Sequence, residues 1–293
     1  MEKIAIVTDS NSGLTPEDVK DTNVFVVPMP FVIDGEEFFE NVTLTKDVFY
    51  DKLEGGAEVS TSQPAIYAVK ELWDELLKTY DKIIHIPMSS GLSQTCNAST
   101  NLSKDYDGKV FVVDNKRISA TLLGSVMEAK YLVQQGKSAK KIVEYLNQSS
   151  LDSSIYLTVS TLKYLKKGGR ITPAGAMLGS LLNVKPVLQI QGSKLDAYAK
   201  VMGLQLAKVK MINALKADLE GRFKHLVDAG EITIATAHAK NDVMAEELKQ
   251  TLKAQFPNIP FMEAELPLSI ACHTGPGALG CGCFRTIYTK KKK

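Results

Sequence analysis

The sequence lacks an excess of charge of either sign. Its 35 basic and 33 acidic side chains leave a net charge of +2 across 293 residues, and the two signs are mixed along the chain. Nucleic-acid binding requires a basic patch or stripe, which is missing here. The only run of like charge, Lys290 to Lys293, we interpret as a solvated tail that offers at most a transient contact to an anionic membrane.

Long apolar runs are missing as well. No stretch approaches the ~20 apolar residues that a membrane helix needs. Residues 1–4 lead directly into an apolar segment and do not show the pattern of a signal peptide. We therefore expect this protein to be located in the cytoplasm.

Cysteines are few, and they do not form a convincing metal-binding motif. The four are Cys96, Cys272, Cys281 and Cys283. Cys272 is adjacent to His273, and in an extended segment the two side chains would point to opposite faces. The Cys-x-Cys spacing of the last pair also differs from the usual zinc spacing. We predict buried reduced thiols and no metal site.

The length and the pattern of the first half predict a Rossmann-like domain. A chain of 293 residues is too long for one ordinary core, which indicates two domains. Short apolar runs typical of buried parallel strands alternate with helical patterns, which gives a doubly wound sheet. Strands are predicted at 4–8, 83–87 and 110–114, and helices at 66–77, after Ser138, and from a start at 15–18. Asp34-Gly35 predicts a hairpin turn between strands at 31–33 and 36–39.

The second half mixes parallel and antiparallel signals and predicts a mixed-sheet α/β domain. Strands are expected at 155–159 and 232–235, with a hairpin-like pair at 185–191 and 194–201 that turns at Gly192-Ser193, and helices at 204–219 and 243–256. The expected domains are residues 1–152 and 153–289, followed by the basic tail 290–293. No segment is rich enough in Pro, Gly or Ser to be a linker, so we expect the domains to pack together with the ligand between them.

Segments rich in hydroxyl groups or glycine occur where strands give way to helices. Ser60-Thr61-Ser62-Gln63-Pro64 and the segment from Ser89 to Thr95 each precede a predicted helix. Either could be a plain helix cap. Together, their hydroxyls and free N–H groups suit a single carboxylate. His273 and the glycines that follow it form either a plain turn or a further set of donors, and Lys167-Gly168-Gly169-Arg170 either a helix end or a fourth candidate.

Other classes of function find less support. The glycine-rich loops that bind nucleotide phosphates are missing. The segment from Gly91 to Thr95 lacks the final glycine of a nucleophile elbow. Asp9, Ser93 and His273 could form a hydrolase triad only if folding brought them together. A serine-type hydrolase of a lipid or another ester, and a binder of another small carboxylate, stay open as alternatives.

At this point the residues resemble the DegV family of fatty-acid-binding proteins, and the likeness runs from about residue 3 to residue 288. The motifs that carry it, in chain order, are Val7-Thr8-Asp9-Ser10, Ser60-Thr61-Ser62-Gln63-Pro64, Ser89-Ser90-Gly91-Leu92-Ser93, Tyr164 to Ile171, Leu182-Asn183-Val184-Lys185-Pro186, and His273-Thr274-Gly275-Pro276-Gly277-Ala278. Any one of them is unspecific, but their common order along the chain is distinctive.

The resemblance implies that one long-chain fatty acid lies in a buried tunnel between two domains. Its carboxylate would be held by Thr61, Ser93 and His273, with Ser62 close by and Arg170 supporting the polar network. It also implies a non-catalytic bacterial carrier that needs no cofactor. Such a carrier presents the acid to a separate fatty acid kinase, which forms an acyl-phosphate for phospholipid synthesis.

Two departures from the family pattern affect these expectations. Gln94 stands where the family often has glycine, and it adds bulk and a donor beside the expected head group. Met202 stands where the family tends to have arginine. If that arginine helps to dock the kinase, Met202 puts docking by this chain in question.

Overall fold

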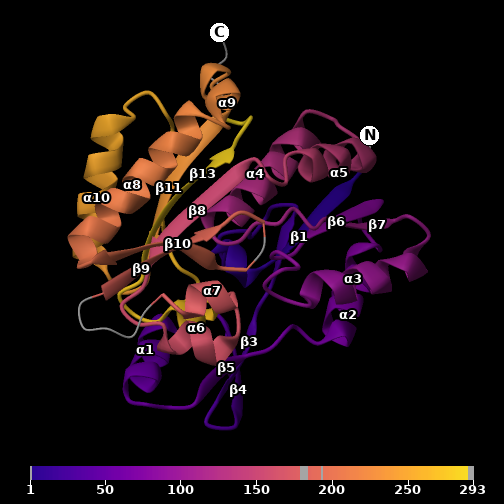
Figure 1. The fold of residues 1–293 in the computed structure, drawn as a ribbon. Coiled ribbons are helices and arrows are strands. Elements are labelled where there is room, and N and C mark those ends of the chain that lie inside the picture. Colours follow the sequence, from indigo (N-terminus) through magenta and orange to yellow (C-terminus); the bar gives the residue numbers. More distant parts are fainter. Residues whose placement is uncertain (1, 179–183, 193, 290–293) are drawn as a thin grey trace. The chain divides into compact units, whose positions relative to one another are not determined.

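A computed structural model describes residues 2–178, 184–192 and 194–289 (Figure 1). The chain divides into two compact units, one comprising the residues up to Ser150 together with Pro267–Ser269, the other beginning at Leu151. The division lies two residues before the end of the predicted first domain (152 against 150). The predicted tail 290–293, Ser193 of the predicted turn, and Leu182 and Asn183 of one motif lie outside the described residues.

A four-stranded parallel sheet forms the centre of the first unit. Its order is β2-β1-β6-β7, and each neighbouring pair is parallel. The strands are β1 (Ile4–Asp9), β2 (Val24–Val27), β6 (Lys82–Ile86) and β7 (Val110–Val112). Every residue of β1 is buried, as expected for a strand that is covered on both faces. The predicted parallel sheet is confirmed.

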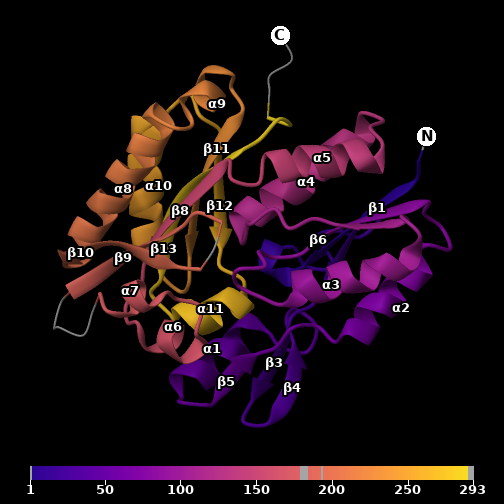
Figure 2. The same ribbon diagram turned by 45° about the vertical axis from the view of Figure 1, so that its right-hand side comes forward.

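Helices cover both faces of this sheet. On one side lie α2 (Ile66–Leu76) and α3 (Thr95–Ser103), and on the other α4 (Ala120–Gln134) and α5 (Ala139–Gln148) (Figure 2). The apolar stripe of α2, formed by Val69, Trp73 and Leu76, packs against the sheet at Val7 and Ile83. The apolar periodicity that predicted α2 therefore corresponds to the face that this helix buries against the sheet.

A separate antiparallel sheet of three strands also belongs to the first unit. Its order is β4-β3-β5, with β3 (Pro30–Ile33), β4 (Glu36–Phe39) and β5 (Val59–Thr61). The turn from β3 to β4 places Asp34 at φ 50° and Gly35 at φ 87°, the left-handed pair that a two-residue hairpin needs. The predicted hairpin is confirmed. The helix α1 (Lys46–Glu54) lies between β4 and β5 in the chain.

The predicted helix start at residues 15–18 is wrong. Residues 16–21 form turns instead. The Asp18 carboxylate accepts hydrogen bonds from both the N–H and the hydroxyl of Thr15, at 2.8 Å and 2.7 Å. Asp21 then adopts a left-handed backbone with φ 59°, which a right-handed helix cannot contain. Short 3-10 turns occur at Ser10–Ser12 and Lys104–Tyr106.

The second unit is built on a six-stranded mixed sheet of order β10-β9-β8-β13-β11-β12. Among its described residues, only β11 and β12 are parallel neighbours, which confirms the predicted mixture. The predicted hairpin-like pair forms the antiparallel strands β9 and β10. The strands are β8 (Ser153–Thr158), β9 (Val184–Ile190), β10 (Asp196–Met202), β11 (Ile232–His238), β12 (Phe261–Glu265) and β13 (Leu279–Arg285).

The core of the second unit lies between this sheet and the helices α8 (Leu204–Glu220), α9 (Lys224–Asp228) and α10 (Asp242–Gln255) (Figure 1). Three shorter helices complete the unit: α6 (Lys163–Gly168), α7 (Pro173–Ala176) and most of α11 (Leu268–Thr274). Across the described ranges, no helix combines the length and the apolar character needed to cross a membrane.

Candidate functional site

The segment from Ser60 to Pro64 is positioned by the small sheet of the first unit. Thr61 is the last residue of β5 and pairs with Phe31. The N–H of Ser62 continues this pairing and donates to the carbonyl of Pro30 at 3.1 Å. The cap position of α2 is Ala65, which makes no side-chain capping bond. The helix-cap explanation of these hydroxyls is therefore wrong, and β5 decides where Thr61 points.

Ser93 lies at the start of α3 in the same unit. Its Oγ accepts a hydrogen bond from the N–H of Thr95 at 3.2 Å and lies 2.9 Å from the Thr95 hydroxyl. The cap position of α3 is Gln94, which makes no side-chain capping bond, so the cap explanation does not hold for Ser93 either. The bonds to Thr95 form a local hydroxyl turn that fixes the Ser93 side chain. Gln94 is exposed, and its amide oxygen accepts from the side chain of Asn97 at 2.9 Å. Gln94, the departure from the family motif, thus bonds to an exposed residue of α3.

An ion pair beside this segment was not foreseen from the sequence. The Lys116 ammonium bonds to the Asp114 carboxylate and donates to the Ser90 hydroxyl at 2.8 Å. The N–H of Ser90 donates to Asp114 at 3.2 Å. Burial raises the pKa of Asp114, but the bonds from Lys116 and Ser90 outweigh it and hold that pKa below its ordinary value. The only sign of this ion pair in the sequence is that two residues of opposite charge, Asp114 and Lys116, stand just after a buried strand.

In the second unit, the structure brings Gly168, Arg170 and His273 together. Gly168 is the last residue of α6, and a Cβ added to it would lie 2.1 Å from Nδ1 of His273. Arg170 donates from Nη1 to the carbonyl of Gly168. Gly169 ends the helix in the left-handed conformation, with φ 67°, as a C-cap glycine does. The Lys167 to Arg170 motif is thus both a helix end and the support of the imidazole.

The imidazole of His273 is neutral at ordinary pH. Burial, and to a smaller extent the nearby charge of Arg170, together lower its pKa to about 4. A neutral ring offers one N–H donor and one acceptor nitrogen. In contact with a carboxylate it therefore serves as a hydrogen-bond donor.

The segment around Cys272 and His273 is helical, whereas the exclusion of a zinc site from the sequence assumes an extended segment. Both residues lie in α11, where successive side chains are about 100° apart, so that Cys272 is buried and His273 half-buried. The glycine turn follows directly, with φ 77° at Gly275 and φ 81° at Gly277. A Cβ on Gly275 would meet the ring of Tyr164 at 2.3 Å. Two of the sequence motifs therefore pack against each other through a glycine.

Potential metal ligands gather elsewhere in the second unit. His238, Asp242 and Glu265 each offer one atom within 4.8 Å of the others. However, Nδ1 of His238 accepts the N–H of Asn241 at 3.3 Å, which places the proton of the neutral ring on Nε2. That nitrogen faces Asp242 at 4.0 Å, and binding a metal through it would move the ring proton to Nδ1, where it would oppose the N–H of Asn241. We assign no metal to this group. The four cysteines are free and buried.

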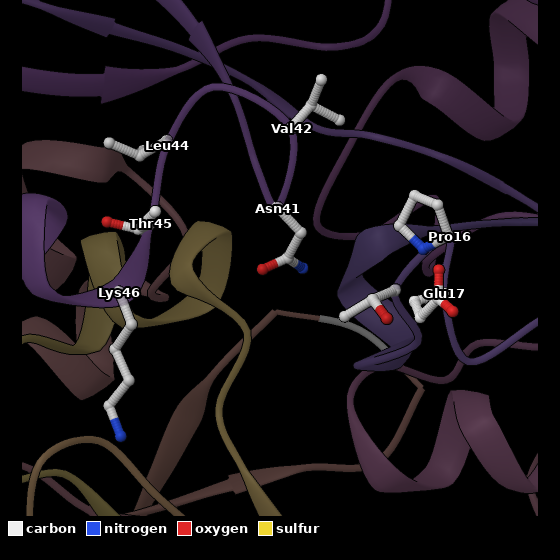
Figure 3. A pocket seen from close by; sticks show the side chains of 8 residues that line it. Pro16, Glu17, Asn41, Val42, Leu44, Thr45 and Lys46 are labelled. Atoms are coloured by element: carbon white, nitrogen blue, oxygen red, sulfur yellow. The ribbon is translucent and has the colours of Figure 1, made fainter.

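A surface hollow of about 470 Å³ occurs in the first unit (Figure 3). Its walls come from the turn at 15–17 and from the segment at 41–46. Asn41 and Glu17 present polar groups to it. None of the predicted carboxylate-binding residues lines this hollow, so we do not assign it to the ligand.

The chain was then compared with known proteins. A family model described as "Uncharacterised protein, DegV family" matches residues 3–286. The chain belongs to the DegV family. It is 31% identical over 282 residues to a DegV domain-containing protein of Staphylococcus aureus strain N315, covering 96% of this chain and 98% of the relative.

Solved structures of this DegV fold include proteins described as binding fatty acids. One from Thermus thermophilus has a TM-score of 0.86 at 29% identity, covering 97% of this chain and 99% of that protein. Another from Bacillus subtilis has a TM-score of 0.83 at 28% identity, covering 97% and 100%. The family and the α/β fold class expected from the sequence are confirmed.

Proposed function

We propose that this chain binds one long-chain fatty acid and holds its carboxylate with Thr61, Ser93 and His273, with Ser62 close by and Arg170 supporting the network. The observation that carries the proposal is the whole-chain similarity to two DegV proteins described as fatty-acid binding. The neutral imidazole of His273 and the hydroxyl of Ser93, which the bonds to Thr95 hold in place, agree with it, because both groups can donate to a carboxylate.

The acyl tail would supply most of the affinity. Burying about 14 methylenes at ~0.8 kcal/mol each gives roughly 11 kcal/mol before the cost of ordering the chain. Hydroxyl and imidazole donors would then fix the end of the tail and satisfy a carboxylate that is costly to bury without partners. Loss of one donor is expected to weaken binding without abolishing it.

Presentation of the acid to a fatty acid kinase in the cytoplasm is part of the same proposal, with no turnover by this chain itself. Met202, the last residue of β10, is 57% exposed and so presents an apolar side chain where the family tends to have arginine. We expect the kinase, if it docks there, to make an apolar contact rather than a charged one.

A serine hydrolase is the less favoured alternative. A triad needs an aspartate that orients the histidine. The carboxylate of Asp9 instead accepts from the backbone and side chain of Asn11 and from the N–H of Met88, and no imidazole bonds to it among the described residues. The hydrogen-bond partners of the Asp9 carboxylate thus all lie in the first unit, and it does not orient a histidine.

Native mass spectrometry of the purified protein tests the proposal directly. We expect an added mass of one long-chain fatty acid, which is lost on denaturation. Thr61→Ala is expected to retain less lipid, whereas Ser60→Ala, on the exposed side of the same strand, is expected to retain as much as the wild type. An unshifted mass after incubation with fatty acids would contradict fatty-acid binding, and hydrolysis of an ester would favour the alternative.

A further inference from the structure

Four buried polar residues of the first unit take no direct part in the proposed site. Asp9, Ser10 and Asn11 follow one another at the end of β1, and Glu40 lies just after β4; each is at most 1% exposed. Neither carboxylate pairs with a basic side chain among the described residues, and burial raises the pKa of both. Buried carboxylates without a counter-charge are costly, so this arrangement needs a reason. We call these four residues the hub.

The first arm of the hub leads to Ser93. Oδ2 of Asp9 accepts the N–H of Met88 at 2.9 Å, two residues after β6 ends. The chain turns there, and the N–H of Ser93 donates to the carbonyl of Ser89 at 3.2 Å. The Asp9 carboxylate thus fixes the beginning of the short turn that ends at Ser93.

The second arm leads to Thr61 and Ser62. The hydroxyl of Ser10 donates to Oε2 of Glu40 at 2.6 Å and accepts the N–H of Met29 at 3.0 Å. Met29 immediately precedes β3, which pairs with β5. The hub therefore anchors the strand against which the Thr61 segment is aligned.

The third arm leads to the helix that carries His273. The N–H of Leu268 donates to Oε1 of Glu40, and the hydroxyl of Ser269 donates to Oδ1 of Asn11 at 2.7 Å. These residues form the first turn of α11, and His273 lies in the last turn of the same helix. The bonds join residues 228 and 258 positions apart in the sequence.

We infer that Asp9, Asn11 and Glu40 are positioning residues of the carboxylate site, because one hub fixes the three segments that carry its donors. The inference rests on the proposed function. Each carboxylate oxygen of Asp9 and Glu40 accepts from an N–H or O–H group. Replacing the carboxylate with an amide would therefore place an NH₂ donor against one of these donors. The segment concerned would shift, and its donor would no longer meet the carboxylate.

The experiment compares binding of a long-chain fatty acid with that of the alcohol of the same chain length, in the wild type and in Asp9→Asn and Glu40→Gln. The alcohol shares the tail but lacks the carboxylate. We expect each variant to bind the acid about tenfold more weakly, the equivalent of one misplaced hydrogen bond, and the alcohol as tightly as before. A role confined to stability would weaken binding of both ligands alike.

Asp218→Asn is the matched control. Its carboxylate accepts the hydroxyl of the buried Tyr156 at 2.7 Å in the second unit and is not connected to the hub. This variant is expected to lower the melting temperature and leave the ratio of acid to alcohol affinity unchanged. Ser269→Ala removes the hydroxyl that bonds to Asn11 and to the Glu40 carboxylate and leaves both carboxylates in place, so it provides the test if the carboxylate variants fail to fold.

The possible results separate the two proposals. An unchanged affinity ratio in folded hub variants would overturn the inference and leave fatty-acid binding intact. A wild type that binds neither ligand would contradict the proposed function, and the inference would fall with it. A ratio that drops in the hub variants and not in Asp218→Asn supports both.

Discussion

Replacement of Gly168 by alanine probes the carboxylate site without removing any donor. The added Cβ would lie 2.1 Å from Nδ1 and 2.9 Å from Cε1 of His273, far inside van der Waals contact. Gly168 does not have a positive φ, so its backbone accepts alanine without strain. The imidazole is therefore the group that must move.

The expected effect falls on binding and not on folding. Alanine is the better helix former by up to about 1 kcal/mol, which offsets part of the cost of moving the ring. A hydrogen bond to a charged group contributes about 1.5–3 kcal/mol. If the displaced ring of His273 loses its bond to the carboxylate, the dissociation constant for a fatty acid should rise about 10- to 150-fold.

Calorimetric titration with a fatty acid measures this change, and a thermal melt checks the fold. Gly169→Asn is the control, because asparagine tolerates the left-handed φ of 67° and nothing lies within 4 Å of the added Cβ. In a His273→Ala background, Gly168→Ala should cost nothing further. Wild-type affinity in Gly168→Ala, or an equal loss without His273, would refute the reasoning.

Three further predictions concern acid stability, thiol reactivity and the β3–β4 turn. Burial lowers the pKa of His85 to about 3 and that of His273 to about 4, so on acidification the unfolded state takes up protons before the folded state does. The free energy of unfolding, measured by urea titration, should therefore fall by about 2 kcal/mol per ring between pH 7 and pH 5. His85→Phe should remove half of this combined loss. Burial raises the pKa of Cys281 to about 12, so iodoacetamide should label it only on unfolding; labelling of the native protein would contradict this. Gly35→Val should cost about 1–2 kcal/mol in chemical unfolding because φ is 87°, and Gly35→Asn clearly less.

Local patterns were sufficient where an element carries its own signal. The run of β1 is apolar throughout, and the stripe on α2 repeats at helical spacing because Trp73 and its neighbours face the sheet. Asp34-Gly35 needs no tertiary support to form its turn. Patterns failed at residues 15–18, where a cap, a proline and acidic residues look like a helix start. There Thr15 and Asp18 do exchange the two bonds of a capping box, but Asp21 adopts the left-handed conformation at φ 59°, so the chain forms turns and no helix follows.

The helix α11 shows why the rest could not be predicted locally. It has only seven residues, and Gly275 and Gly277 follow at once, so the sequence around His273 resembles a turn. The acceptor for its first N–H comes from Glu40, 228 residues away in the sequence. A helix end stabilised by so distant a residue leaves no mark in its own sequence. The conformation of the helix that carries His273 is therefore a property of the folded unit, which is why Glu40 escapes a motif search although it contacts the helix that carries a candidate donor.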